Sequence, residues 1–113
     1  MPQTARFGDV TEPTLADDAA NFLKLTLDEI RRAHGDGCRL AASFMLASLG
    51  ANDGLHRSDL EDAVAFDLDY RTAPELRRVA LATDELIVRS IVEVRGGRVF
   101  LNPAAAAVIG GER

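Results

Sequence analysis

Hydrophobic residues recur every three or four positions over residues 15–33, and this spacing predicts an amphipathic helix. Acidic residues follow the start of this segment and basic residues precede its end, which suits the dipole of a helix. Gly35 is a suitable residue to end it. The positions expected to face inward are Leu15, Ala19, Phe22, Leu23, Thr26 and Ile30.

The stretch RLAASFMLASLG, residues 39–50, predicts a second helix. The segment HGDG before it can turn sharply, and the segment ANDG at its end favours another turn. Because the stretch is apolar nearly all round, we expect this helix to be central and covered by other elements on most sides.

Two further helix starts carry the same four-residue signal. Ser58 with Glu61, and Thr72 with Glu75, fit the capping box, in which the hydroxyl accepts from the third amide and the carboxylate accepts from the cap amide. They predict helices over about residues 59–66 and 73–88, separated by a turn at DLDYR. The expected inward positions are Leu60, Ala63, Val64 and Phe66 on the first helix, and Leu76, Val79, Ala80, Thr83, Leu86 and Ile87 on the second.

The segment VEVRGGRVFL predicts a hairpin, because two alternating runs are joined by Gly96 and Gly97. In this register Arg95 faces Arg98, and the inner side is formed by Val92, Val94, Val99 and Leu101. Asn102 and Pro103 are suitable cap and first residues for a brief terminal helix.

The order of these elements resembles the winged helix-turn-helix superfamily over about residues 38–102. The matching parts are RLAASFMLASLG as first core helix, SDLEDAVAF before the turn, TAPELRRVALATDELIV as recognition-type helix and VEVRGGRVFL as wing. Two features depart from the pattern: the helix before the turn is acidic, and no strand is evident between the first two core helices.

The resemblance implies a mainly α fold with a small C-terminal β-hairpin and an additional N-terminal helix. We expect a flexible arm at residues 1–13, an N-terminal helix at 14–35 and a winged-helix domain with a short tail at 36–113. In dimeric members of such families, an extra helix of this kind often forms the subunit contact, so a homodimer is expected.

Composition fits one globular domain. The chain has 113 residues, 47% hydrophobic and 27% charged, which is ordinary for a soluble protein. No apolar run approaches the roughly 20 residues that cross a bilayer, and the N-terminus lacks the apolar core of a signal peptide. We therefore expect a cytoplasmic protein with no membrane partner.

The net charge of −5 argues against nucleic acid, but its distribution changes the picture. Residues 1–70 carry six Lys or Arg against thirteen Asp or Glu, whereas residues 71–98 carry six Arg against four acids. Arginine can grip phosphate or guanine with two hydrogen bonds, which suits nucleic-acid contact. The alternative for the high ratio of Arg to Lys is codon bias in the genome.

The resemblance implies that the start of the helix at 73–88 faces the major groove of DNA. The candidate residues there are Arg71, Thr72, Glu75, Arg77 and Arg78. Glu75 is ambiguous, because the predicted cap already uses it. The alternative is a solvated helix face that only keeps the domain soluble.

Arg95 and Arg98 complete the candidate DNA-binding set. Like charges directly opposed across an antiparallel pair repel each other unless an anion relieves them, and a phosphate of the DNA backbone would do so. The alternative is that both side chains are screened by solvent and spread apart at little cost.

Other reactive residue types give no catalytic or metal motif. The carboxylates between Asp59 and Asp69 lack the spacing of a calcium loop, and the acids at the helix start suit its dipole. His34 and His56 have no evident catalytic companion, and Cys38 opens an apolar helix, where burial is expected. We expect no enzyme, no cofactor and no metal.

Two functions remain open. The first is a sequence-specific double-stranded DNA-binding protein, a homodimeric transcriptional regulator that uses the helix at 73–88 and the wing. The second is an adaptor or inhibitor of the same fold that does not bind DNA, whose acidic face from Asp59 to Asp69 engages a basic protein partner.

Overall fold

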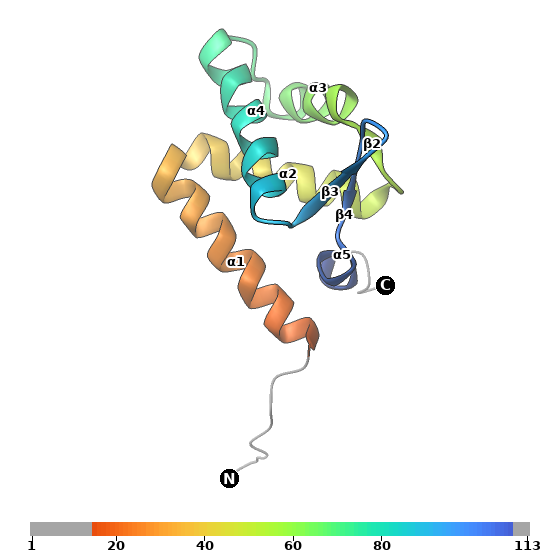
Figure 1. The fold of residues 1–113 in the computed structure, drawn as a ribbon. Coiled ribbons are helices and arrows are strands. Elements are labelled where there is room, and N and C mark those ends of the chain that lie inside the picture. The colour runs from red at the N-terminus through yellow and green to blue at the C-terminus, as the bar shows by residue number, and fades with distance from the viewer. Residues whose placement is uncertain (1–14, 110–113) are drawn as a thin grey trace.

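The computed structural model describes residues 15–109, and its fold is mainly helical with one three-stranded antiparallel sheet (Figure 1). The predicted flexible arm, residues 1–13, lies outside the described residues. In chain order the elements are α1 (Leu15–His34), α2 (Asp36–Ala51), β2 (Leu55–His56), α3 (Arg57–Leu68), α4 (Ala73–Val88), β3 (Val92–Arg95), β4 (Arg98–Leu101) and α5 (Pro103–Ile109).

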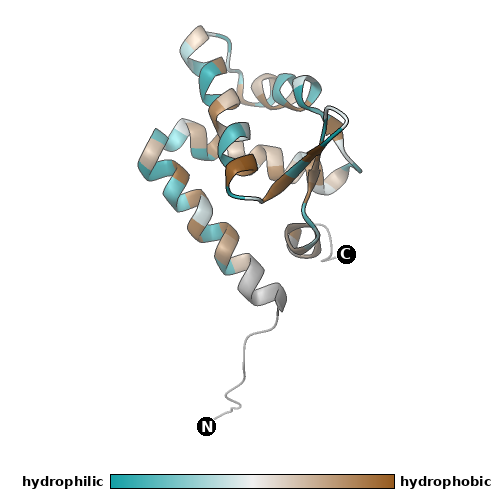
Figure 2. Cartoon of the chain, in the orientation of Figure 1, coloured by the Kyte–Doolittle hydropathy of each residue, from teal (hydrophilic) through white to brown (hydrophobic). Residues whose placement is uncertain are grey.

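Helix α2 is the centre of the fold, as its apolar sequence predicts. It packs against α1, α3, α4, α5 and β4, and Figure 2 shows hydrophobic residues in α4, β3 and β4. Its buried residues are Cys38, Ala41, Ala42, Met45, Leu46 and Leu49. The helix begins one residue after Gly35, so Asp36 and Gly37 belong to its first turn and not to a longer loop.

A short strand lies where the sequence shows none. Leu55 and His56 form β2 between α2 and α3, and β2 pairs antiparallel with β4, giving the sheet order β2-β4-β3. Gly54 precedes the strand with a φ of +86°, and the ring of Phe100 packs so closely that a Cβ at this position would overlap it. Two residues are too few for a period-two pattern, which explains why the sequence does not reveal this strand.

The predicted hairpin forms in the predicted register. Arg95 pairs with Arg98 and Val94 with Val99, and both tip glycines have positive φ, as a tight two-residue turn requires. Val92 and Val99 are buried. Val94, which was expected to face inward, is 47% exposed, although its partner Val99 is fully buried. Val94 belongs to the edge strand β3, whereas Val99 belongs to the central strand β4.

Helix α3 differs from its prediction at both the cap and the buried side. It begins at Arg57, and its N-cap residue, His56, makes no side-chain cap bond, so the capping box expected at Ser58 does not form. Glu61 instead accepts a hydrogen bond of 2.8 Å from Nε of Arg57. The buried positions are Leu60, Val64 and Ala65, whereas Ala63 and Phe66, both expected inward, are exposed.

Helix α4 begins as predicted. Thr72 is its N-cap, and both hydrogen bonds of the capping box with Glu75 are present. The buried positions are Val79, Ala82, Thr83 and Leu86. Leu76 was expected to be buried and is 46% exposed, because it lies in the first turns of α4, beyond most of the core.

The first and last helices lie against each other on one flank of α2 (Figure 1). Leu23, Thr26 and Ile30 of α1 are buried as predicted, whereas Phe22 is 52% exposed and was wrongly expected inside. Asn102 caps α5 as predicted, since its Oδ1 accepts a hydrogen bond of 2.8 Å from the amide of Ala105.

Within residues 15–109, no helix combines the length and the apolar composition needed to cross a membrane.

Candidate nucleic-acid interface

The turn between α3 and α4 is short and well fixed. Asp69 ends α3 in the left-handed conformation, with φ 58° and ψ 38°, which a short polar side chain tolerates. The hydroxyl of Tyr70 donates to the carbonyl of Gly37 at 3.2 Å, and this bond ties the turn to the first turn of α2. The start of α4 therefore has one defined position relative to the core.

Three predicted site residues lie at this start, and their polar groups are engaged within the chain. Oε1 of Glu75 accepts from the amides of Arg71 and Thr72 at 2.9 and 3.0 Å, and these hydrogen bonds lower the pKa of its carboxyl group. The hydroxyl of Thr72 accepts from the amide of Glu75 at 3.3 Å. Arg71 is 84% exposed and forms a 2.8 Å ion pair with Asp69.

Arg77 and Arg78 are the candidate arginines of α4 whose guanidinium groups are not engaged. Both side chains are exposed, and neither has an ion pair or hydrogen bond within residues 15–109. Arg77 lies on the side of α4 opposite its buried residues. Arg78 lies beside it, with Cδ so close to Gly37 that a Cβ there would come within 2.9 Å.

The basic character of α4 is confined to its first two turns. Asp84 lies two turns after Arg77 on the same side of the helix. Its carboxylate accepts from Nη2 of Arg57 at 2.8 Å, and the same nitrogen donates to the carbonyl of Ala80 at 3.3 Å. Arg57 therefore joins α3 to the middle of α4 instead of adding to the basic surface.

The hairpin arginines both have partners within the chain. Arg98 is half-buried and donates from Nη2 to the carbonyl of Gly54 at 2.8 Å. The guanidinium of Arg95 stacks over the ring of Phe100 at 4.0 Å and lies 3.7 Å from the carboxylate of Glu93. These contacts within the chain stabilise both arginines without a phosphate. The pairing of Arg95 with Arg98 across the hairpin therefore does not by itself indicate an anion site.

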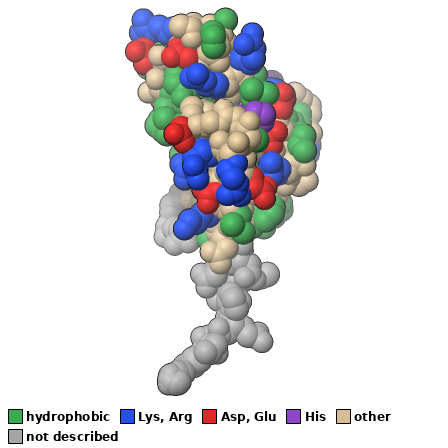
Figure 3. All heavy atoms as spheres, turned by 90° about the vertical axis from the view of Figure 1, so that its left-hand side faces the viewer, with side chains coloured by type: hydrophobic (Ala, Val, Ile, Leu, Met, Phe, Trp, Pro, Cys, Tyr) green, Lys and Arg blue, Asp and Glu red, His purple; other side chains and the backbone are tan. Residues whose placement is uncertain are grey.

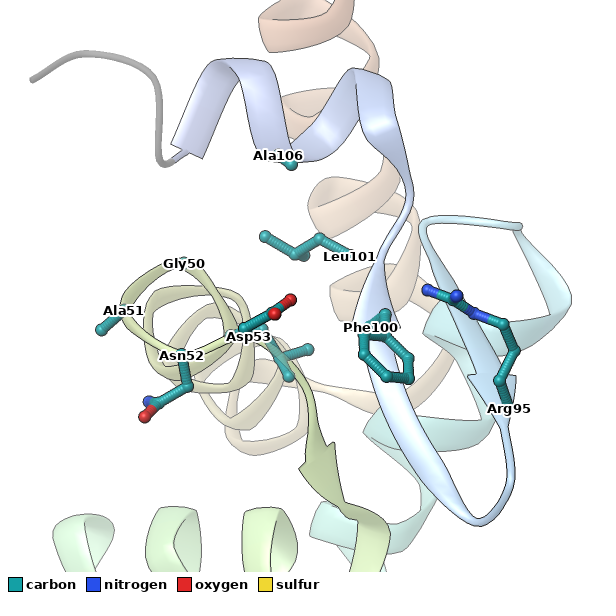
Figure 4. Close-up of a pocket in the computed structure, with 9 residues that line it drawn as sticks. Gly50, Ala51, Asn52, Asp53, Arg95, Phe100, Leu101 and Ala106 are labelled. Carbon is teal, nitrogen blue, oxygen red and sulfur yellow. The ribbon is translucent and has the colours of Figure 1, made fainter.

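Arg95 and Phe100 also line a pocket of about 410 Å³ at the end of α2 (Figure 4). The close-up shows Asp53 on the α2 side and the stacked pair Arg95 and Phe100 on the hairpin side. Leu101 and Ala106 form the apolar wall between them.

The structure does not gather the seven candidate residues into one continuous basic surface. In Figure 1 the hairpin tip and the first turns of α4 lie in the same half of the molecule, on opposite sides of α3. Figure 3 shows that the side of the molecule carrying α1 and the start of α4 mixes basic and acidic side chains. The candidate interface is therefore best centred on the first turns of α4.

Cys38 and His34 are engaged in the fold, whereas His56 is exposed and its side chain makes no cap hydrogen bond. Cys38 is fully buried, and burial raises the pKa of its thiol to about 11, with a further contribution from the charge of Glu85. His34 lies 3.2 Å from Glu85, whose pKa is lowered by hydrogen bonds from Arg89 and His34. Residues 15–109 contain no group of three or more metal-ligating side chains.

Two residues that the sequence did not indicate as surface or site residues shape these surfaces. Arg57 bridges α3 and α4, and Phe66 is 85% exposed on α3. The signal for Phe66 was present: Leu68 continues the inward stripe of Leu60 and Val64, which places Phe66 on the outer side of the helix.

Comparison of the chain with protein-family models, with curated proteins and with solved structures gives no match.

Proposed function

We propose that this chain is a winged helix-turn-helix protein that binds double-stranded DNA through the first turns of α4. The order α2-β2-α3-α4-β3-β4 and the sheet order β2-β4-β3 support this proposal. The strand missing from the sequence pattern between the first two core helices is supplied by β2. In such a protein α4 is the recognition helix and the β3–β4 hairpin is the wing.

The observation that carries the proposal is the pair Arg77 and Arg78. Both are exposed and form no ion pair or hydrogen bond in the described chain, at the start of the second helix of a helix-turn-helix. The charge of Arg78 makes only a minor contribution to the lowered pKa of Glu75. The N-terminal residues of a recognition helix contact base edges in the major groove. A free guanidinium there can donate two hydrogen bonds to guanine or to a phosphate.

The other candidate residues take supporting roles in this proposal. Thr72 and Glu75 fix the first turn of α4 from which the arginines project. Arg71 exchanges its ion pair with Asp69 for a contact with a DNA phosphate. Breaking this ion pair loses little stability, because a pair exposed to this extent contributes about 0–1 kcal/mol. Arg95 and Arg98 contact the DNA backbone from the wing, as secondary contributors.

The regulatory form of the proposal is a homodimeric, sequence-specific transcriptional regulator in the cytoplasm. Phe22 and Leu25 support a dimer contact on α1, because they lie one turn apart and are 52% and 59% exposed. A dimer doubles the arginine contacts, and this helps a chain with a net charge of −5 to bind a polyanion.

The test is fluorescence anisotropy of a labelled mixed-sequence duplex titrated with the full chain at increasing salt. We expect binding at low salt, with log K falling by roughly 0.9 per decade of salt for each phosphate contact. Replacing Arg77 and Arg78 by Ala should weaken binding by about thirtyfold or more, since two contacts worth roughly 1–3 kcal/mol each sum to at least about 2 kcal/mol.

The matched control replaces Arg31 and Arg32 by Ala. This pair is adjacent, exposed and without a partner among the described residues, so the variant loses the same charge from a different helix. Equal weakening by both double variants would show that net charge alone drives binding. No binding of duplex DNA at low salt would overturn the proposal.

A further inference from the structure

Phe66 on α3 is the most exposed large hydrophobic side chain in the described part of the chain, at 85%. Val88 is next at 78%, and the exposed apolar residues of α1, Phe22 and Leu25, are less exposed at 52% and 59%. Aromatic side chains anchor many protein interfaces because they bury a large area at low conformational cost. Phe66 is not used by the core or by the proposed DNA contact.

A pocket of about 490 Å³ adjoins this side chain at the end of α3. It is lined by Asp62, Ala65, Phe66, Asp69, Tyr70 and Arg71. The ring of Tyr70 is held in place by the hydrogen bond from its hydroxyl to Gly37. Two aromatic residues, two acidic residues and one arginine thus line one pocket, which we call the Phe66 pocket.

The surface around the Phe66 pocket is acidic. Asp59, Asp62 and Asp67 are exposed and have no hydrogen-bond or ion-pair partner in the described chain. The nearby cation Arg57 is turned toward α4 and bound there by Asp84. Arg71 reaches only Asp69, in an ion pair whose side chains are 84% and 75% exposed, so another cation can replace it.

These charges restrict what can cover the pocket. Phosphates of nucleic acid and anionic membrane surfaces are repelled by the three unpaired aspartates. A second copy that presents the same face would bring acids against acids, because a twofold interface pairs identical patches. A basic partner has the complementary charge.

We propose that the Phe66 pocket accepts an arginine or lysine side chain from a basic segment of a partner protein, with an apolar residue of that segment on Phe66. A cation between aromatic rings and carboxylates gains from both the ring faces and the negative charges. The proposal can be tested apart from DNA binding, because it uses the outer side of α3 and neither Arg77 nor Arg78. The two proposals share only Arg71, which lines the pocket and is also proposed to contact phosphate.

The test is a titration of the ¹⁵N-labelled full chain with a terminally blocked peptide of arginine, leucine and serine, followed by NMR. We expect saturable shifts of amides in α3 and in the α3–α4 turn. Phe66→Ala and Asp62→Asn should each weaken the apparent affinity by about tenfold or more. The same peptide with citrulline in place of arginine should not bind.

Two variants control for loss of apolar surface and loss of charge elsewhere. Val88→Ala removes an apolar side chain that is 78% exposed at the end of α4, and Asp53→Asn removes an exposed, unpaired carboxylate after α2. Neither should change peptide affinity. Circular dichroism is expected to show unchanged helix content for all four variants, since each replaced side chain is exposed.

Three results would overturn the proposal. The first is the absence of saturable shifts in α3. The second is equal weakening by the control variants, which would show that the peptide binds through charge alone. The third is a change in sedimentation of the peptide-free chain on Phe66→Ala, which would show that a second copy of the chain covers this side chain.

Discussion

Helices α3 and α4 are neighbours whose sequences begin with the same capping-box pattern, but their N-termini are capped differently. Ser58 and Glu61 fit the capping box as well as Thr72 and Glu75 do, yet only the second pair forms it. The difference comes from Arg57, which binds Glu61 and also reaches Asp84 of α4. At the start of α3, Arg57 binds Glu61 and also contacts α4, so Glu61 does not cap the helix together with Ser58.

The two helices also present opposite surfaces to solvent. The outer side of α3 carries unpaired aspartates around an exposed phenylalanine, and the first turns of α4 carry two unpaired arginines. Only a turn of a few residues separates these surfaces, although their charges favour different partners. The net charge of −5 therefore does not show that the chain carries two local surfaces, one acidic on α3 and one basic at the start of α4.

The largest expected effect compares one leucine from each helix. Leu60 of α3 is 1% exposed and Leu76 of α4 is 46% exposed. Leu60→Ala should lower the free energy of unfolding by about 2–5 kcal/mol, because it leaves a cavity in the core. Leu76→Ala should lower the free energy of unfolding by less than about 1 kcal/mol, since much of the Leu76 side chain is already exposed to solvent in the folded chain.

Urea unfolding followed by circular dichroism measures both leucine variants. Equal losses of stability would contradict the packing described here, because they would mean that the start of α4 is as deeply buried as the middle of α3.

A smaller effect compares the two hydroxyl residues of the capping signals. Thr72→Ala should destabilise the chain by about 1 kcal/mol, because the amide of Glu75 loses its acceptor. Ser58→Ala should change the free energy of unfolding little, because Ser58 lies inside α3 and caps nothing. A comparable loss from Ser58→Ala in the same urea experiment would show that the second box also forms.

The smallest effect is a pH dependence confined to α4. Hydrogen bonds from the amides of Thr72 and Arg71 lower the pKa of Glu75 in the folded chain. The stabilisation by this carboxylate is therefore present above its unfolded pKa of about 4.3 and lost as the pH falls through the folded pKa. The stability difference between the unmodified chain and Glu75→Gln should shrink over this acidic range.

Urea unfolding at neutral and acidic pH measures this difference. A difference that stays constant from neutral pH down to acid would contradict the role given to the charge of Glu75.

Much of the fold follows from the sequence, because its signals are long or carry strong turn residues. The helical period of α1, the nearly all-apolar stretch of α2 and the Gly96–Gly97 bend each predict their element correctly. The strand β2 could not be predicted, because two residues carry no period and the strand exists only through pairing with β4. Burial on α3 was misassigned at Phe66, where the inward stripe continues at Leu68 instead.

The candidate site was less predictable than the fold. Sequence places arginines along the chain but not the acceptors that the fold brings to them. Arg98 meets the carbonyl of Gly54 across a sequence separation of 44 residues. Arg57 meets Asp84 on another helix. Such long-range contacts decide which cations stay available, and they leave Arg77 and Arg78 as the strongest candidates in α4.

The most direct test of the central claim is NMR of the ¹⁵N-labelled full chain titrated with duplex DNA. We expect shifts that centre on Arg77, Arg78 and the first turn of α4, with weaker shifts at the hairpin tip and none at Phe66. Shifts that centre on the outer side of α3, or that spread evenly over every basic side chain, would contradict DNA binding through α4.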